Sequence, residues 1–137
     1  MDINILDASN YFKGLLILIG KDKRVTESES IILKRIGKAL GFEKEFCEKA
    51  IRDILINNYI EDTPPVFSTE ELARKFILDG LTLAASDNEL HTAEVEWLKS
   101  VIKTNRLDIQ WFKSAKDAIQ NSKALQLRLE AEELMRI

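Results

Sequence analysis

The sequence is poor in residues that interrupt helices, form disulfides or bind nucleic acid. Its 137 residues include five Gly and two Pro, so few positions force a chain break, which favours long helices over short strands. The single cysteine, Cys47, excludes an intramolecular disulfide, so the fold does not depend on an oxidising compartment. A net charge of −3 gives no basic stripe, and the composition therefore predicts no nucleic-acid partner.

The sequence also lacks a long apolar run and a secretory signal. Its longest apolar run, residues 15–19, is far too short to span a bilayer. The opening residues 1–4 carry no positive flank of the kind a secretory signal requires. We therefore expect a cytoplasmic protein without membrane insertion, large enough for one domain with a single core.

One acidic turn occurs twice, and the copies are 87 − 22 = 65 positions apart. In each copy an Asp follows an apolar helix, an aliphatic residue comes three positions later, and a Glu follows four positions after that. Apolar residues on both sides of the turns match at the same offset, which predicts two copies of one helical unit. The matched residues are Phe12, Leu16, Ile19, Leu33, Ile36, Phe46, Ala50 and Ile54, with Ile77, Leu81, Ala84, Leu98, Val101, Trp111, Ala115 and Ile119.

Hydrophobic periodicity predicts an all-α fold of six or seven helices that form a compact bundle. We expect a single domain, residues 1–137, built from pseudo-repeats at about 10–58 and 68–121 and a C-terminal helix at about 122–136. The one clear break is Pro64-Pro65, where two backbone donors are missing and extended geometry is forced.

Capping residues mark the expected helix starts. The first helix is predicted to begin near residues 9–10. Thr26 and Glu29 have the spacing of a capping box, in which each side chain bonds the other residue's amide. Residues 68–71 have the composition of a second capping box, and Asp108 can cap the last helix of the second unit.

The carboxylates of the two turns have two interpretations. Asp favours tight turns, and carboxylates at a helix N-terminus are stabilised by unpaired amides and the helix dipole, so the turns can be purely structural. Alternatively, the carboxylates gather a divalent metal ion through Asp87, Glu89 and Glu94, joined by Asp22 and Glu29 if the repeats pack face to face.

An EF-hand is excluded, because the Gly and the bidentate Glu that it needs are Thr92 and Leu98 in the second copy. Zinc is disfavoured, since the only soft ligands, Cys47 and His91, fall in different repeats. Any ion at the turns is therefore expected to be calcium or magnesium rather than zinc.

The stretch Ala84-Ala85-Ser86-Asp87-Asn88-Glu89-Leu90, followed by Glu94 and an aliphatic helix, resembles the hallmark of the TerB-like family of bacterial tellurite-resistance and stress proteins. That family's pattern is small residues, Asp-Gly, one residue, an aliphatic, and a Glu four positions later. The resemblance covers roughly residues 10–120. It implies no enzymatic activity, and it implies an acidic, metal-binding surface at Asp22, Glu29, Asp87 and Glu94.

Similar domains are attached to some membrane-anchored co-chaperones, so the resemblance implies protein partners that include membrane-associated stress complexes. The sequence departs from the family at one position. The Gly after the Asp is Lys23 in the first copy and Asn88 in the second. Asn tolerates a left-handed backbone, whereas Lys pays a steric cost, so the two turns are expected to differ.

No catalytic constellation is present. Cys47 has no histidine in its own repeat to act as a base, and no Gly-rich loop is available to hold a phosphate. Two functional hypotheses rank ahead of a third, a metal-dependent hydrolase, which would need paired carboxylates that converge in a cleft. The first is a non-enzymatic stress-response binding module whose acidic turns bind a divalent ion. The second is a protein–protein adaptor whose acidic turns only cap helices.

Overall fold

The computed structural model describes residues 2–56, 61–87, 90–121 and 129–136 of the chain, without the side chains at 2, 22, 135 and 136. The predicted all-α class is confirmed. The described α-helices are α1 (Ile5–Ile19), α2 (Glu27–Ala39), α3 (Lys44–Ile56), α4 (Glu70–Ala84), α5 (Thr92–Thr104) and α6 (Ile109–Gln120). Shorter elements are the 3-10 helices η1 (Gly20–Asp22), η2 (Ala85–Asp87) and η3 (Glu130–Glu133), and the strands β1 (Asp2–Ile3) and β2 (Met135–Arg136).

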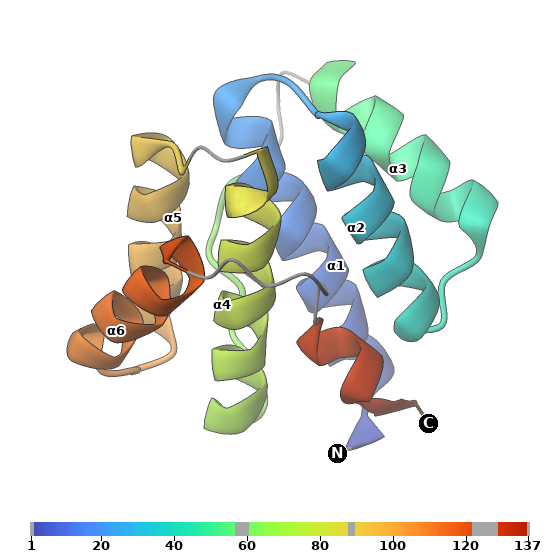
Figure 1. Cartoon of the computed structure of the whole chain (residues 1–137). Coiled ribbons are helices and arrows are strands. Elements are labelled where there is room, and N and C mark those ends of the chain that lie inside the picture. Colours follow the sequence, from blue (N-terminus) through green and yellow to red (C-terminus); the bar gives the residue numbers. More distant parts are fainter. Residues whose placement is uncertain (1, 57–60, 88–89, 122–128, 137) are drawn as a thin grey trace.

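Helices α1 and α4 lie in the middle of the molecule, with α2 and α3 on one side and α5 and α6 on the other (Figure 1). Helix α1 contacts α2, α3, α4 and α5. Each element from α4 to α6 begins 65 positions after its counterpart from α1 to α3. The described helices therefore start with the same spacing of 65 positions that separates the two acidic turns.

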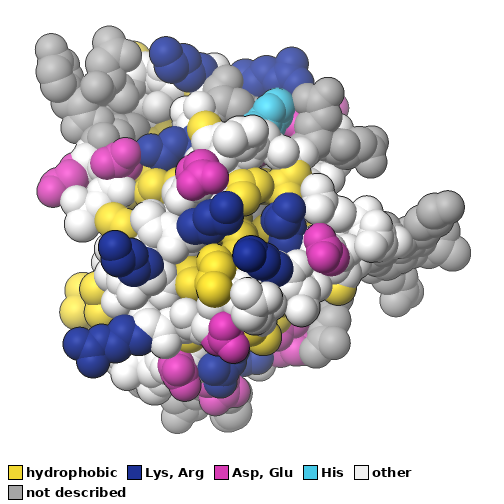
Figure 2. All heavy atoms as spheres, turned by 90° about the vertical axis from the view of Figure 1, so that its left-hand side faces the viewer, with side chains coloured by type: hydrophobic (Ala, Val, Ile, Leu, Met, Phe, Trp, Pro, Cys, Tyr) yellow, Lys and Arg dark blue, Asp and Glu magenta, His cyan; other side chains and the backbone are white. Residues whose placement is uncertain are grey.

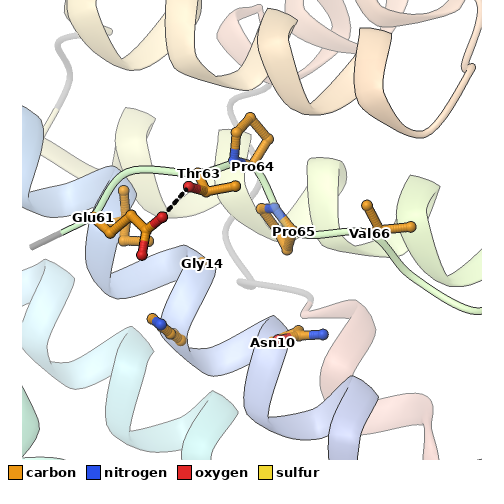
Figure 3. A pocket seen from close by; sticks show the side chains of 9 residues that line it. Asn10, Gly14, Glu61, Thr63, Pro64, Pro65 and Val66 are labelled. Atoms are coloured by element: carbon orange, nitrogen blue, oxygen red, sulfur yellow. Dashed lines mark hydrogen bonds between the residues drawn. The ribbon is translucent and has the colours of Figure 1, made fainter.

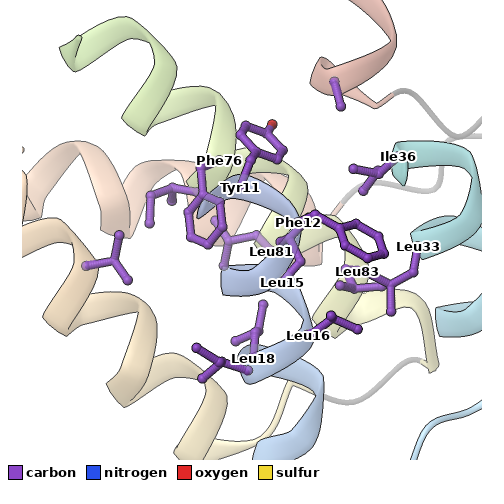
Figure 4. Packing of buried hydrophobic residues seen from close by; sticks show 14 of the residues in the cluster. Tyr11, Phe12, Leu15, Leu16, Leu18, Leu33, Ile36, Phe76, Leu81 and Leu83 are labelled. Carbon is purple, nitrogen blue, oxygen red and sulfur yellow. The ribbon is translucent and has the colours of Figure 1, made fainter. Parts of the chain in front are cut away.

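The core lies where α1, α2 and α4 meet, and Figure 4 shows side chains from these helices pointing toward one another. Residues 15–19, the longest apolar run, are all buried because α1 has neighbours on several sides. Aromatic rings continue the contact along α1, where Tyr11 packs edge-on to Phe76 with ring centroids 5.4 Å apart. Burial of each large apolar side chain contributes roughly 1.5–3 kcal/mol.

Helix α1 begins earlier than predicted. Asn4 is its N-cap, and the Asn4 side chain accepts a hydrogen bond of 2.8 Å from the Asp7 amide, so the helix starts at Ile5 and not at residues 9–10. The apolar pattern misplaced this start because Ile5 and Leu6 are exposed and do not belong to the buried stripe.

Other predicted caps agree with the structure in part. Asp108 caps α6 by accepting from the amide two positions later at 2.8 Å, as expected. At the start of α4 the N-cap is Thr69, whose hydroxyl accepts from the Leu72 amide at 3.1 Å. The predicted box over residues 68–71 is therefore wrong in detail, since Ser68 bonds instead to the buried carboxylate of Asp7.

The prediction of a C-terminal helix over 122–136 is wrong for the part that the structure describes. Residues 129–136, hereafter the C-terminal segment, form η3 and β2, and β2 pairs in parallel with β1. Residues 122–128 lie outside the described part of the chain. The described helices include none with the length and apolar character needed to cross a membrane.

Candidate functional site

The first acidic turn begins where α1 ends. The chain makes the single 3-10 turn η1 and then passes through Lys23, which has a left-handed backbone with φ of 63°. A non-glycine residue rarely takes this conformation. The turn nonetheless keeps the geometry for which glycine is suited, so the Lys at this position does not abolish it.

The Thr26–Glu29 capping box is formed as predicted. The Glu29 carboxylate accepts from the Thr26 amide at 2.9 Å, and the Thr26 hydroxyl accepts from the Glu29 amide at 3.2 Å. The Glu29 side chain is fully buried. A carboxylate in this position is stabilised by the unpaired amides and the positive end of the α2 dipole.

The second acidic turn has the same design with different side chains. After η2, the N-cap of α5 is His91, and the His91 amide donates to the Glu94 carboxylate at 3.2 Å. The Glu94 side chain is fully buried, like that of Glu29. Asp87, whose side chain is only 9% exposed, lies with its Oδ2 3.8 Å from His91 Nε2. Histidine thus occupies the place that a hydroxyl occupies in the first turn.

The two turns lie beside each other in the fold. Element η1 packs against α5, and η2 packs against α2, so each turn contacts the helix that follows the other turn. The hydroxyls of Ser28 and Ser86 are 3.4 Å apart across this contact. We call residues 20–29 and 85–94 together the acidic junction.

The structure describes the side chains of only some of the predicted metal ligands. It brings Glu29 and Glu94 to the N-termini of α2 and α5, and Asp87 beside His91. The Asp22 side chain and Glu89 lie outside the described residues. Among the described side chains, no group of three or more His, Cys, Asp or Glu is placed to hold a metal ion. A cation at the junction would thus need Asp22 or Glu89 as well.

A second polar site lies at Asp79, in the middle of α4. Its side chain is 1% exposed. It accepts three hydrogen bonds: from the Tyr11 hydroxyl at 2.6 Å, the Glu130 amide at 2.6 Å and the Ala131 amide at 2.9 Å. Burial raises the pKa of Asp79 to about 6, although the three hydrogen bonds act to lower it. Burial and the adjacent Asp79 also raise the pKa of Tyr11 well above its usual value.

Sequence reasoning missed the Asp79 site. The available signal was a carboxylate between Phe76 and Leu81 on the apolar stripe of a helix, where a charge is expensive unless it has partners. Those partners are the hydroxyl of Tyr11, 68 positions earlier, and two amides from a segment about fifty positions later in the chain. Local patterns could not identify them.

A cavity of about 330 Å³ lies between α1 and the loop before α4 (Figure 3). Gly14 forms part of its floor, and Pro64 and Pro65 form part of its wall. The two charged side chains in the lining, Lys13 and Glu61, are exposed. The cavity therefore offers no desolvated charge with which to recognise a ligand.

The face formed by α5 and α6 has mixed chemistry. On it, Lys and Arg side chains lie around and between hydrophobic ones, with acidic side chains interspersed (Figure 2). Cys47, on the other side of the molecule, is buried, and burial with the neighbouring Glu48 raises the pKa of its thiol. A buried thiol of raised pKa is a poor nucleophile.

Fold and site together define an all-α protein in which two buried capping carboxylates, Glu29 and Glu94, lie at the N-termini of α2 and α5, where the two acidic turns meet. Comparisons with protein-family profiles, with curated proteins and with solved structures find no match to this chain.

Proposed function

We propose that this chain is a non-enzymatic binding module of the TerB-like type, acting in a cytoplasmic stress response, and that a divalent cation binds at its acidic junction. The observation that supports the cation is the close approach of the two turns, with Ser28 and Ser86 in contact and each turn packed on the other half. The repeated turn places carboxylates of both halves in this region. One composite site is then a better description than two separate ones.

The chemistry of the candidate ligands suits a hard cation. Asp22, Glu29, Asp87, Glu89 and Glu94 offer carboxylate oxygens, which calcium and magnesium prefer. A bound cation would offset the repulsion between these charges and would hold the halves of the protein together. Protein partners would then recognise a surface whose shape depends on the ion.

The alternative is a protein–protein adaptor whose acidic turns only cap helices. The observation that favours it is that Glu29 and Glu94 each accept a hydrogen bond from an N-cap amide. The absence of a three-ligand group among the described side chains points the same way. The two hypotheses differ in whether binding of a partner depends on an ion.

Isothermal titration calorimetry with calcium, magnesium, manganese and zinc tests the ion. The variant Asp22→Asn/Asp87→Asn removes two candidate ligands. The variant Glu29→Gln/Glu94→Gln removes charge while keeping a side-chain oxygen for each cap. We expect native protein to bind calcium, magnesium or manganese, and both variants to bind at least about tenfold more weakly, as expected on losing hard-ion ligands.

A matched control removes two exposed carboxylates far from the junction, Glu45→Gln/Glu71→Gln, and should leave the heats unchanged. No heat from native protein, or equal heats from native and junction variants, would contradict the cation. The adaptor hypothesis would then predict that partner capture survives both chelator and the Asp22→Asn/Asp87→Asn change. Loss of the partner under either condition would contradict the adaptor.

A further inference from the structure

The C-terminal segment lies across the body of the protein. Figure 1 shows it in front of α1, between α4 and α2, near the N-terminal strand. Element η3 packs against both α4 and α2. Strand β2 then adds to β1 in parallel, pairing Asp2 with Met135 and Ile3 with Arg136. The segment therefore combines one 3-10 turn with a short strand and does not form an α-helix.

Three apolar side chains anchor the segment. Leu129, Ala131 and Leu134 are 1%, 0% and 7% exposed, while Glu132 and Glu133 between them are exposed. The surface between α4 and α2 thus accepts a bulky residue at each end and a small residue near the middle. Ala131 and Leu134 are three positions apart, the spacing of side chains on one face of a 3-10 turn, and η3 packs against α4 and α2.

Polar contacts fix the backbone and the charge of the segment. Asp79 accepts hydrogen bonds from the amides of Glu130 and Ala131, so a buried carboxylate binds the backbone of the segment. Lys75 Nζ lies 3.3 Å from the Glu130 carboxylate, in a pair whose side chains are 19% and 16% exposed. Arg35 binds the Glu132 carboxylate through two nitrogens, at 2.5 and 3.1 Å.

All of these anchor points belong to α2 and α4, which are held in the core by other contacts. If the segment left, Asp79 would keep the Tyr11 hydroxyl as its partner among the described hydrogen bonds. A buried carboxylate deprived of two donors is costly, so the surface would favour recapture of another backbone that offers amides.

We propose that the surface between α4 and α2 is a peptide-binding groove, that residues 129–134 occupy it in cis, and that a partner protein binds by presenting a segment of the same chemistry. That chemistry is apolar, acidic, small, acidic, any residue, apolar. The first acid pairs with Lys75 and the second with Arg35, while Asp79 binds the backbone between them. The C-terminal segment of this chain then competes with the partner for the groove.

Competition between the tethered segment and a free peptide determines the affinity that we expect for the peptide. A segment tethered to its own groove has an effective concentration in the mM range, so a free peptide binds an intact chain weakly. Weakening the tethered segment without touching the groove should therefore expose the site. The full-length variant Leu129→Ala/Leu134→Ala does this, because it removes the two bulky anchors and leaves α2 and α4 unchanged.

Fluorescence anisotropy tests the proposal with a labelled synthetic peptide of residues 129–136, Leu-Glu-Ala-Glu-Glu-Leu-Met-Arg. We expect the double variant to bind it at least about tenfold more tightly than the native chain does. A scrambled peptide of the same composition should not bind. Adding Arg35→Glu to the double variant should abolish binding, and a peptide carrying Glu132→Arg should restore it.

Circular dichroism establishes whether the double variant folds. If it does not, full-length Glu132→Arg replaces it, because this change breaks only the exposed pair with Arg35. Equal peptide binding by native and folded variant chains would overturn the proposal, as would no binding by the variant. A dimer of the variant that exchanges residues 129–136 between copies, detected by light scattering, would also overturn it, since a second copy would then be the occupant.

Discussion

The chain crosses its two central helices at equivalent places, and the two crossings have opposite chemistry. Pro65 lies over Gly14 of α1, and Glu130 lies over Asp79 of α4. Gly14 and Asp79 are 65 positions apart, as are Pro65 and Glu130. The crossing at Gly14 is drawn in Figure 3, where Pro64 and Pro65 stand above α1.

At the first crossing Pro65 and Gly14 meet without a side-chain polar group of either residue. Pro65 has no amide hydrogen, Gly14 has no side chain, and the ring of Phe76 packs against the Gly14 backbone. At the second crossing the Glu130 amide donates to Asp79. The Asp79 carboxylate also binds the hydroxyl of Tyr11, the residue 65 positions before Phe76.

The comparison shows that one backbone arrangement can be stabilised in two ways. At the first crossing the polar groups of the loop bond elsewhere. The Asn105 side chain donates to the Pro65 carbonyl at 2.8 Å and accepts from the Phe67 amide, and Asp7 accepts from the Ser68 amide. The second crossing buries a polar group and supplies all of its partners. An apolar contact is the simpler means of permanent packing, whereas a satisfied polar network specifies one partner and one register.

Among the changes that test this comparison, removal of the Asp79 carboxylate should have the largest effect on the stability of the protein. Asp79→Ala leaves the Tyr11 hydroxyl and two backbone amides without their acceptor, so we expect a loss of about 3 kcal/mol in the free energy of unfolding near pH 5. Urea denaturation measures it. Tyr11→Phe, which removes one of the three donors, is the control, with a loss of about 1 kcal/mol. Equal losses from the two variants would refute the role given to the amides.

Gly14→Ala should break the first crossing. A Cβ at this position would lie 2.8 Å from two atoms of the Phe76 ring. The overlap should destabilise the protein by about 2 kcal/mol, more than the gain of up to about 1 kcal/mol in helix propensity. The same change in a Phe76→Leu background should cost at least about 1 kcal/mol less, because contacting residues are coupled. Additive effects in thermal denaturation would contradict this contact.

The two crossings should also differ in their response to pH. Asp79 faces Tyr11 on α1 and Glu130 on η3, and Glu130 in turn pairs with Lys75 on α4. The pKa of Asp79 is about 6 in the folded protein, above the value of about 3.9 in an unfolded chain. The folded state therefore binds the proton more tightly, and this stabilisation is complete below about pH 4 and lost as pH rises through about 6.

Between about pH 5 and about pH 7.5 the native protein should lose about 1 kcal/mol more stability than Asp79→Asn, which has no carboxyl to titrate. Urea denaturation of both proteins at each pH measures the difference. Parallel pH profiles would show that Asp79 does not keep a raised pKa in the fold.

The two acidic turns can be compared in the same way, and the expected effects on stability are smaller. Thr26→Ala removes the hydroxyl that accepts from the Glu29 amide, at a cost of about 1 kcal/mol. His91→Ala keeps the backbone amide that donates to Glu94, so its cost should be about half as large or less. Thermal denaturation of both variants tests the difference, and a larger loss from His91→Ala would reverse our ranking of the caps.

Much of the fold could be predicted from local patterns. The Thr26–Glu29 box and the Asp108 cap depend on residues within four positions of each other, and they form as expected. The start of α1 was misplaced because Asn4 caps a first turn whose apolar residues are exposed. The C-terminal segment differs from the predicted α-helix because its leucines suggest a helical stripe, whereas tertiary contacts bury them on either side of a single 3-10 turn.

The candidate sites were predictable to different degrees. The acidic turns could be found because their residues recur at a fixed offset, but their mutual contact through Ser28 and Ser86 is a result of packing. The Asp79 network could not be found, because its members come from α1, α4 and η3. No short-range spacing connects a hydroxyl, a carboxylate and two amides so far apart in the chain.

The sequence by itself determined the helical class, the helix-capping chemistry and the offset of 65 positions, because each depends on contacts between near neighbours or on composition. Tertiary structure alone decided that the acidic turns meet and that Gly14 and Asp79 lie under different segments. It also decided that residues 130–133 form a 3-10 turn against α2 and α4 and not part of an α-helix. The physical reason is that burial and hydrogen bonding between distant segments outweigh local helix propensity, which differs by at most about 1 kcal/mol between residues other than proline.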